Sequence, residues 1–185
     1  MELLRTERLL LRRWTESDLD AFFNLYSQDD VMRWLGPHPR RALTTRREAR
    51  DRLRAWRNRA DALPVPLGLW GIVPLTAAEQ PGPPVGTVLL LPLSDSDGPT
   101  GLVEVGWHLH PQHQGRGLAT KAARAILARA AEAGIDQVLA LTDLDNLASQ
   151  RVTARLGMRD EGVTDRWFGL TTRQYRKVLS SAGGQ

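Results

Sequence analysis

Residues 104–133, with the sequence EVGWHLHPQHQGRGLATKAARAILARAAEA, decide the fold of this chain. Apolar and other side chains alternate from Leu102 to His110, the period of two that predicts a β-strand. Pro111 should end this strand, because proline cannot donate to a strand ladder. The spacing then changes to that of a helix. The expected buried face of that helix consists of Leu118, Ala122, Ala125, Ile126, Ala130 and Ala133.

The turn between this strand and helix, residues 114–119 (QGRGLA), has the features of an anion-binding loop. Backbone N–H groups at a helix start, glycines that allow close approach and a neighbouring arginine together suit a pyrophosphate. A Walker loop would need its lysine elsewhere, since Lys121 has the wrong spacing. A dinucleotide fingerprint would have Thr120 in place of its third glycine, and Asp143 as its ribose-binding acid, so this alternative stays open.

A third pattern, Q-x-x-G-x-A, is met by Gln114, Gly117 and Ala119. It resembles the pyrophosphate loop, [QR]-x-x-G-x-[GA], of the GNAT superfamily of acetyl-CoA-dependent N-acetyltransferases. The pattern also fits one register earlier, with Gln112 and Gly115 in the first two places. We prefer the later register because the predicted strand then ends where the strand of this family ends.

Further segments strengthen this resemblance. Residues 146–158 (NLASQRVTARLGM) are similar to a later helix of the family, with the pattern N-x-x-S…L-G-[FM]. Near the N-terminus, residues 6–12 (TERLLLR), Asp18 and residues 30–35 (DVMRWL) resemble the branch that acetylates ribosomal-protein N-termini. The resemblance covers roughly residues 3–179.

The expected fold is α+β, a GNAT-like mixed and mostly antiparallel sheet flanked by helices on both faces. We expect a single domain over residues 1–179 and a flexible tail over residues 180–185. The resemblance implies that the central strand and the strand after the long helix splay apart, with the pantetheine arm in the gap. The other strands are expected at residues 4–14, 67–75, 85–93, 137–142, 159–163 and 166–178. Helix starts are expected at Thr15, at Thr44 or Thr45, and at Asn146.

The composition excludes several classes of functional site. A chain of 185 residues can bury a sizeable core, and the absence of cysteine excludes disulfides, thiolate metal sites and an acyl-cysteine intermediate. No apolar run approaches the roughly 20 residues of a membrane span, and no leader segment is recognisable, so we expect a soluble, cytoplasmic protein without membrane contact. The net charge of +4 permits nucleic-acid binding. A solvated arginine-rich surface explains it more simply, so no nucleic-acid partner is expected.

Two residues of the central strand are candidates for the general base. Glu104 is the first, acting directly or through water, because an amine acceptor is largely protonated at neutral pH. His108 is the second, because histidine titrates near neutral pH. Alternation places both on one face with His110, and each could equally be structural. His108, His110 and His113 also suggest a metal site, but they lack a nearby carboxylate ligand, so no metal is expected.

The resemblance implies the remaining roles. Many GNAT enzymes carry a tyrosine acid where this chain has Thr153, and Ser149 stands where the resembled branch has its alternative hydroxyl. The Leu109 N–H is expected to face the oxyanion. The residues expected to bind acetyl-CoA are Trp107, Leu109, Gln114, Gly115, Arg116, Gly117, Leu118, Ala119, Thr120, Asn146 and Ser149.

Together these features predict direct transfer of an acetyl group from acetyl-CoA to a primary amine in a ternary complex. The amine is a protein N-terminus or a small molecule, and the protein is a monomer or homodimer. Two alternatives stay open: a non-catalytic CoA-binding GNAT-like regulatory module, and a basic ribosome- or RNA-associated protein.

Overall fold

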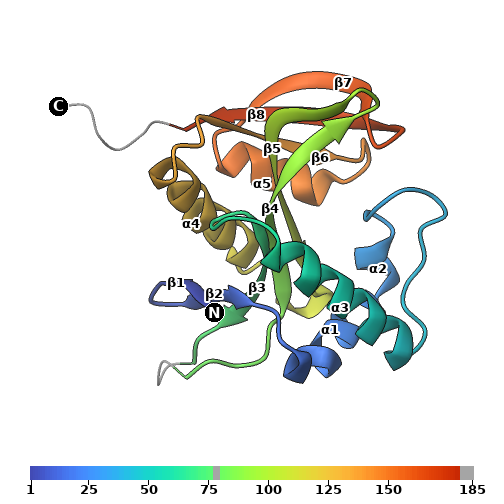
Figure 1. The fold of residues 1–185 in the computed structure, drawn as a ribbon, viewed down its shortest axis with the longest axis vertical. Helices are drawn as coiled ribbons and strands as arrows, with labels where there is room; N and C mark the ends of the chain where they lie inside the picture. The colour runs from blue at the N-terminus through green and yellow to red at the C-terminus, as the bar shows by residue number, and fades with distance from the viewer. Residues whose placement is uncertain (77–79, 180–185) are drawn as a thin grey trace.

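The computed structural model describes residues 1–76 and 80–179, and this part of the chain contains one eight-stranded sheet with the order β1-β2-β3-β4-β5-β6-β8-β7 (Figure 1). Every neighbouring pair is antiparallel except β5 and β6, which are parallel. The strands are β1 (Glu2–Arg5), β2 (Leu9–Arg13), β3 (Gly68–Pro74), β4 (Gly86–Asp95), β5 (Gly98–Leu109), β6 (Gln137–Thr142), β7 (Arg159–Trp167) and β8 (Leu170–Val178). The α-helices are α1 (Leu19–Tyr26), α2 (Asp29–Met32), α3 (Arg46–Asp61), α4 (Leu118–Glu132) and α5 (Leu147–Arg155), and the two 3₁₀ helices are η1 (Glu16–Asp18) and η2 (Pro111–His113). The expected mixed, mostly antiparallel sheet with helices is confirmed.

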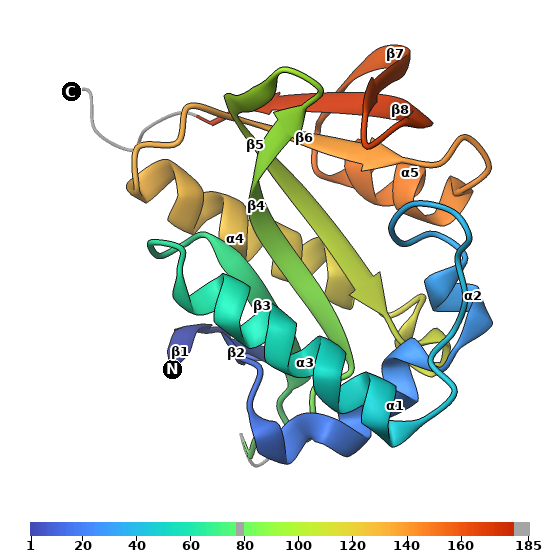
Figure 2. The same cartoon turned by 45° about the vertical axis from the view of Figure 1, so that its right-hand side comes forward.

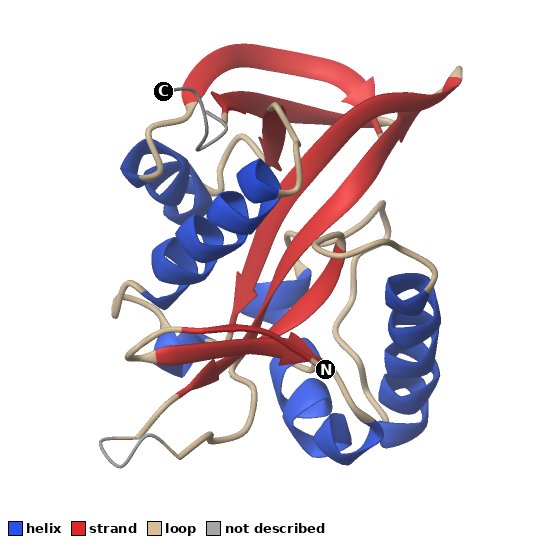
Figure 3. Ribbon diagram, turned by 60° about the vertical axis from the view of Figure 1, so that its left-hand side comes forward, coloured by secondary structure: helices blue, strands red, loops and turns tan. Residues whose placement is uncertain are grey.

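Helices cover both faces of the sheet (Figures 2 and 3). Helix α4 packs on one face, where Val105 of β5 and Ile126 of α4 belong to the same buried cluster. On the other face, α3 packs over β3 and β4, with Ala60 against Leu69 and Leu89. Because side chains alternate along β5, the residues between its α4-facing positions project toward the α1 and α3 side.

The predicted helix starts are confirmed in most cases. Thr15 and Asp18 form a capping box ahead of α1, and the Thr45 side chain accepts a hydrogen bond from the Glu48 N–H at 3.2 Å. Helix α4 begins directly after Gly117, as the change of period predicts. Its packed face matches the expectation except at Ala133, which lies beyond the last helical residue and is exposed.

Two strand boundaries were predicted wrongly. The expected strand 4–14 is a hairpin of β1 and β2, because the Thr6 side chain accepts a hydrogen bond from the Leu9 N–H at 3.1 Å and closes a turn. The turn between β7 and β8 lies at Phe168 and Gly169, whose φ angles of 57° and 65° are those of a two-residue type I′ hairpin. Both turns interrupt segments whose alternating pattern alone gives no break.

Strands β5 and β6 diverge soon after they meet. In the described chain they pair at a single position, Glu104 with Leu139, whereas β4 and β5 pair continuously from Gly86–Leu109 to Pro92–Val103. The splay expected from the resemblance is therefore present, and it leaves the end of β5 without a strand partner on one side.

Two further expectations concern the C-terminal tail and membrane contact. The tail expected at residues 180–185 lies outside the described residues. None of the described helices has the combination of length and apolarity that crossing a membrane requires.

The fold predicts that α4 is held by its apolar face. Ile126 has no exposed surface, so Ile126→Ala should lower the free energy of unfolding by about 2–5 kcal/mol, measured by denaturant titration. The control is Arg129→Ala on the exposed face of the same helix, where Arg129 pairs with Glu132 in solvent. That change should stay within about 0.5 kcal/mol. Equal losses in the two variants would contradict this packing.

Candidate active site

A cavity of about 1070 Å³ opens where β5 and β6 separate. It is lined by residues of α1, α2 and α3 and by residues of the start of α4, the end of β6, α5 and β8, the last of which pairs with β6. All but one of the residues expected at the site line it: Glu104, Trp107, His108, Leu109, Gln114, Gly115, Gly117, Leu118, Ala119, Thr120, Asn146 and Ser149. The exception is Arg116, which is exposed and does not line the cavity.

The end of β5 turns backbone donors toward the gap. The His110 N–H donates to the Val85 carbonyl at 2.9 Å, so every second residue of β5, counted back from His110, directs its N–H toward β4. Successive N–H groups of a strand point to opposite sides, so the N–H of Leu109 points away from β4, toward the side where β6 has diverged. This is the geometry needed for an oxyanion-binding amide.

The start of α4 offers further backbone donors. Gly117 is the N-cap with a φ of 75°, a conformation that glycine adopts readily, and it carries no side-chain cap. The Lys121 N–H donates to the Gly117 carbonyl at 3.0 Å and makes the first bond of the helix, so the amides of residues 118–120 have no partner within the helix, and these residues line the cavity. The Gln114 side-chain amide donates to the Leu109 carbonyl at 3.1 Å and so ties this loop to the end of β5.

The first turn of α5 forms the opposite wall. Asn146 is buried and caps the helix, accepting a hydrogen bond from the Ser149 N–H at 3.1 Å. The half-buried Ser149 lines the cavity. Thr153 is fully buried and its hydroxyl donates to the Gln150 carbonyl at 2.7 Å. Thr153 is therefore already engaged inside the protein, whereas Ser149 presents its side chain to the site.

Glu104 is a half-buried carboxyl that lines the cavity. Burial raises its pKa to about 7, opposed by the positive charge of Arg59. In the described part of the chain the Glu104 side chain has no hydrogen-bond partner. A carboxyl with this pKa exchanges protons near neutral pH, which is what a general base requires.

His108 ends a chain of hydrogen bonds that begins in the core. The Trp14 indole N–H donates to the Thr87 hydroxyl at 3.2 Å, the Thr87 and Tyr26 hydroxyls are 2.7 Å apart, and Tyr26 lies 3.1 Å from Nδ1 of His108. An indole can only donate, so the fully buried Thr87 hydroxyl has Tyr26 as the acceptor for its proton. Tyr26 then donates to Nδ1. Burial lowers the pKa of His108 to about 4, so the neutral ring carries its proton on Nε2.

The other two histidines of the motif lie apart from these groups. His110 follows the last residue of β5, and its Nδ1 accepts a hydrogen bond from the Gln112 N–H at 3.3 Å. Unlike Glu104 and His108, His110 does not line the cavity, so the structure gives it no place among the candidate site residues. Among residues 1–76 and 80–179 there is no group of three or more side chains placed to hold a metal ion.

The loop after α2, which lies near the end of β6 (Figure 2), contributes residues to the lining of the cavity. Arg40 forms an ion pair with Asp143 at the end of β6, and it also donates to the carbonyls of Arg33 and Gly36 at 2.8 and 2.7 Å. Asp143 is thus engaged by Arg40, which removes the basis for interpreting it as a ribose-binding acid.

Sequence reasoning missed several residues of the cavity. Tyr26, Arg52 and Trp56 come from helices far from the motif, and their spacing indicates only helix amphipathicity. Thr142 and Thr172 are buried and line the cavity, and their hydroxyls have no hydrogen-bond partner in the described chain.

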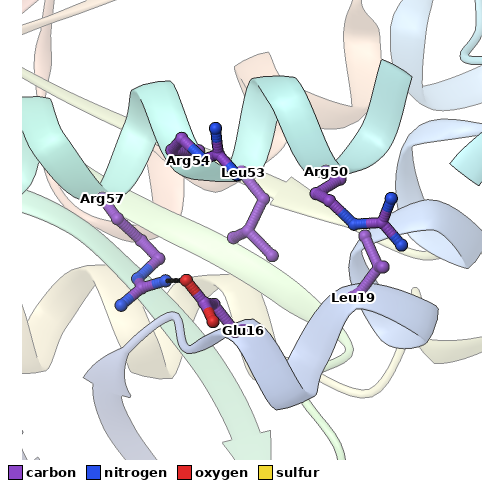
Figure 4. Close-up of a pocket in the computed structure, with 6 residues that line it drawn as sticks. All are labelled: Glu16, Leu19, Arg50, Leu53, Arg54 and Arg57. Carbon is purple, nitrogen blue, oxygen red and sulfur yellow. Dashed lines mark hydrogen bonds and ion pairs between the residues drawn. The ribbon is translucent and has the colours of Figure 1, made fainter. Parts of the chain in front are cut away.

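A second, much smaller hollow of about 110 Å³ lies between α3 and the segment formed by η1 and α1 (Figure 4). The Arg57 guanidinium bridges it to Glu16 at 2.7 Å. It is too small for a cofactor, and Arg50 and Arg54 at its rim do not line the large cavity.

Comparisons with known proteins agree with this arrangement. The family model described as the acetyltransferase (GNAT) domain matches residues 8–159. An uncharacterized N-acetyltransferase of Bacillus subtilis, YoaA, is 26% identical over 163 residues, which are 87% of this chain and 85% of that protein.

Solved structures share the fold. A putative GNAT-family acetyltransferase from Bordetella pertussis superposes with a TM-score of 0.71 at 26% identity, covering 96% of this chain and 99% of the other. RimL, a ribosomal L7/L12 alpha-N-protein acetyltransferase solved in complex with coenzyme A, gives a TM-score of 0.75 at 17% identity, covering 98% and 99%.

Burial of Glu104 predicts a pH-dependent stability. The pKa of this carboxyl is about 7 in the folded protein against 4.5 for a solvated glutamate, so its burial costs nothing below about pH 4.5 and costs most above about pH 7. Glu104→Gln should therefore raise the melting temperature at pH 8 and change it little at pH 4.5, by calorimetry at both values. A melting-temperature difference of the same size at both pH values would show that Glu104 is not a buried titrating group.

Proposed function

Because the chain belongs to the GNAT acetyltransferase family, we propose that it transfers an acetyl group from acetyl-CoA directly to a primary amine. The observation that carries this proposal is the gap between β5 and β6, which has the Leu109 N–H on its wall and the uncapped start of α4 at its end. We infer that residues 1–179 act as one catalytic domain.

The donor half of the cavity suits acetyl-CoA. The amides of residues 115–120 offer their N–H groups, and the positive end of the α4 dipole, to a pyrophosphate. A pantetheine arm in the gap would place the thioester carbonyl beside Leu109. The Leu109 N–H then stabilises the oxyanion of the tetrahedral intermediate.

Three side chains receive separate roles in this proposal. Glu104 takes a proton from the acceptor ammonium, directly or through one water, and the freed amine attacks the thioester carbon. Once the C–N bond has formed, the attacking nitrogen gives up its second proton to solvent. As the C–S bond then breaks, Ser149 donates a hydrogen bond to the departing thiolate, which is finally protonated from solvent. His108 keeps its proton on Nε2 and positions the acceptor as a donor, because Nδ1 is occupied by Tyr26.

The acceptor is an amine, as in the proteins of this family that are named N-acetyltransferases. A protein N-terminal amine is one candidate, because residues 6–12 and 30–35 resemble the branch that acetylates ribosomal-protein N-termini, and RimL shares the fold. A small-molecule amine is the other.

The two alternatives to catalysis are less well supported. A non-catalytic CoA-binding module would not need Glu104 and Ser149, which both line the cavity. The RNA-associated alternative is weakened by the ion pairs of Arg46 with Asp20 and Arg57 with Glu16, which occupy part of the basic surface of α3.

Binding of CoA should stabilise the protein. At a hundredfold excess over its dissociation constant CoA should add about 2.7 kcal/mol to the free energy of unfolding, seen as a rise in melting temperature. Gly117→Glu should remove this shift, because a carboxylate at the start of α4 repels the pyrophosphate. A shift with NAD but none with CoA would contradict the proposal.

The matched control for this variant is Gly134→Glu, beyond the far end of α4. Both glycines have a positive φ, and a Cβ added at either one would meet no atom within 4 Å, so the two substitutions carry similar backbone strain. Gly134→Glu should keep the shift with CoA. Loss of the shift in both variants would show that the effect of Gly117→Glu is not local to the loop.

Substitutions of Glu104, Ser149 and His108 should have different effects on the kinetic constants. Glu104→Gln should lower kcat/KM most between about pH 7 and the pKa of the amine, where wild-type Glu104 is ionised and the amine still needs deprotonation. Ser149→Ala should lower kcat with acetyl-CoA affinity nearly unchanged. His108→Gln should raise the KM of the amine without moving the pH profile.

The assignment of the base has its own check. Arg59 lowers the pKa of Glu104, so Arg59→Gln should move the acidic limb of the kcat/KM profile to higher pH. If Glu104→Gln kept the wild-type profile while His108→Gln lost its acidic limb, histidine would be the base and the role of Glu104 would be withdrawn.

A further inference from the structure

Helix α3 presents one stripe of side chains to the acceptor half of the cavity. Arg52, Trp56 and Arg59 are four and three residues apart, the spacing of one helical face, and all three line the cavity. Trp56 packs edge-on against Tyr26 with ring centroids 5.1 Å apart, and its ring lies 6.1 Å from that of His108. The stripe is therefore held against the groups that surround the acceptor amine.

Arg52 lacks the partner that a half-buried arginine usually has. In the described part of the chain no carboxylate lies within 4 Å of its guanidinium, and its Nη1 lies 3.6 Å from the Met32 sulfur. Two other arginines that line the cavity differ, because Arg33 pairs with Asp30 and Arg40 with Asp143. A guanidinium held beside a thioether in a cavity is placed for an anionic ligand, with several N–H donors left over.

The charge balance of this half of the cavity supports the same interpretation. Asp30 and Asp143 are neutralised by their own arginines, which leaves Glu104 as the free acid among the described lining residues. The positive charge of Arg59 acts on Glu104 and lowers its pKa. Arg52 is then an uncompensated positive charge, which would repel a simple ammonium and attract an amine that carries a negative group.

We propose that Arg52 binds a carboxylate or phosphate group of the acceptor, so that the substrate is an amine bearing a second, anionic group. This inference rests on the proposed function. The amine reaches Glu104 while the anionic group reaches Arg52, and the face of Trp56 between them packs against the atoms that connect the two. Arg52 thereby selects the acceptor without taking part in proton transfer.

The test uses matched amines with the purified full chain and acetyl-CoA. β-Alanine is compared with its amide, which lacks the carboxylate, and phosphoethanolamine with ethanolamine, which lacks the phosphate. Values of kcat/KM are corrected for the unprotonated fraction of each amine. At least one anionic member should be preferred tenfold or more, and the pair that shows the preference identifies the anion.

Three variants locate the preference. Arg52→Gln should reduce it to about onefold by raising the KM of the anionic amine while leaving the neutral one unchanged, and Arg52→Lys should restore part of it. Arg54→Gln is the matched control, because Arg54 is exposed on the same helix and faces the small hollow instead (Figure 4). If Arg52→Gln is poorly folded, the kcat/KM ratios of anionic to neutral amine in the wild type and in Arg52→Lys still test the role of Arg52.

The outcomes separate the two proposals. Acetylation of neutral and anionic amines at equal kcat/KM would overturn the role of Arg52 and leave the proposed function standing. A preference that survives Arg52→Gln would also overturn it. Absence of acetylation with every amine, in a protein that binds acetyl-CoA, would overturn the proposed function and this inference together.

Discussion

The separation of β5 from β6 is the constraint on which the rest of this structure depends. A parallel pair that continued beyond Glu104 and Leu139 would engage the Leu109 N–H and fill the cavity with a strand. Splaying leaves the Leu109 N–H without a strand partner, so that a ligand in the cavity can accept its hydrogen bond. The helix α4 holds one wall of this gap through the buried Ile126 face, and the capped start of α5 holds the other.

Electrostatics divides the resulting cavity in two. On the donor side, backbone amides at the start of α4 present partial positive charge without a titrating group. On the acceptor side, burial has opposite effects on two neighbours of the same strand: it raises the pKa of Glu104 to about 7 and lowers that of His108 to about 4. One strand thus supplies a proton acceptor, Glu104, and a fixed hydrogen-bond donor, His108. Two titratable groups have separate roles when their surroundings shift their pKa values in opposite directions.

The donor side could be predicted from the sequence better than the acceptor side, for a physical reason. The strand, turn and helix of residues 104–133 are contiguous, so spacing alone places Gly117 and Leu109 near one another. The relay behind His108 joins Trp14 and Tyr26 to Thr87 across 73 and 61 residues, and no local pattern reports such contacts. The turn at Thr6 was missed because it depends on one side-chain hydrogen bond. Arg52 could not be identified as a candidate binding residue from the sequence, because its lack of an ion-pair partner is visible only in the structure.

A crystal structure of the complex with acetyl-CoA would show directly whether the gap between β5 and β6 is the site of acetyl transfer. We expect the pyrophosphate on the amides at the start of α4 and the pantetheine arm between the two strands. We also expect the thioester oxygen about 3 Å from the Leu109 nitrogen. A cofactor bound outside this gap, or a thioester directed away from both Leu109 and Glu104, would contradict the assignment of this cavity as the active site.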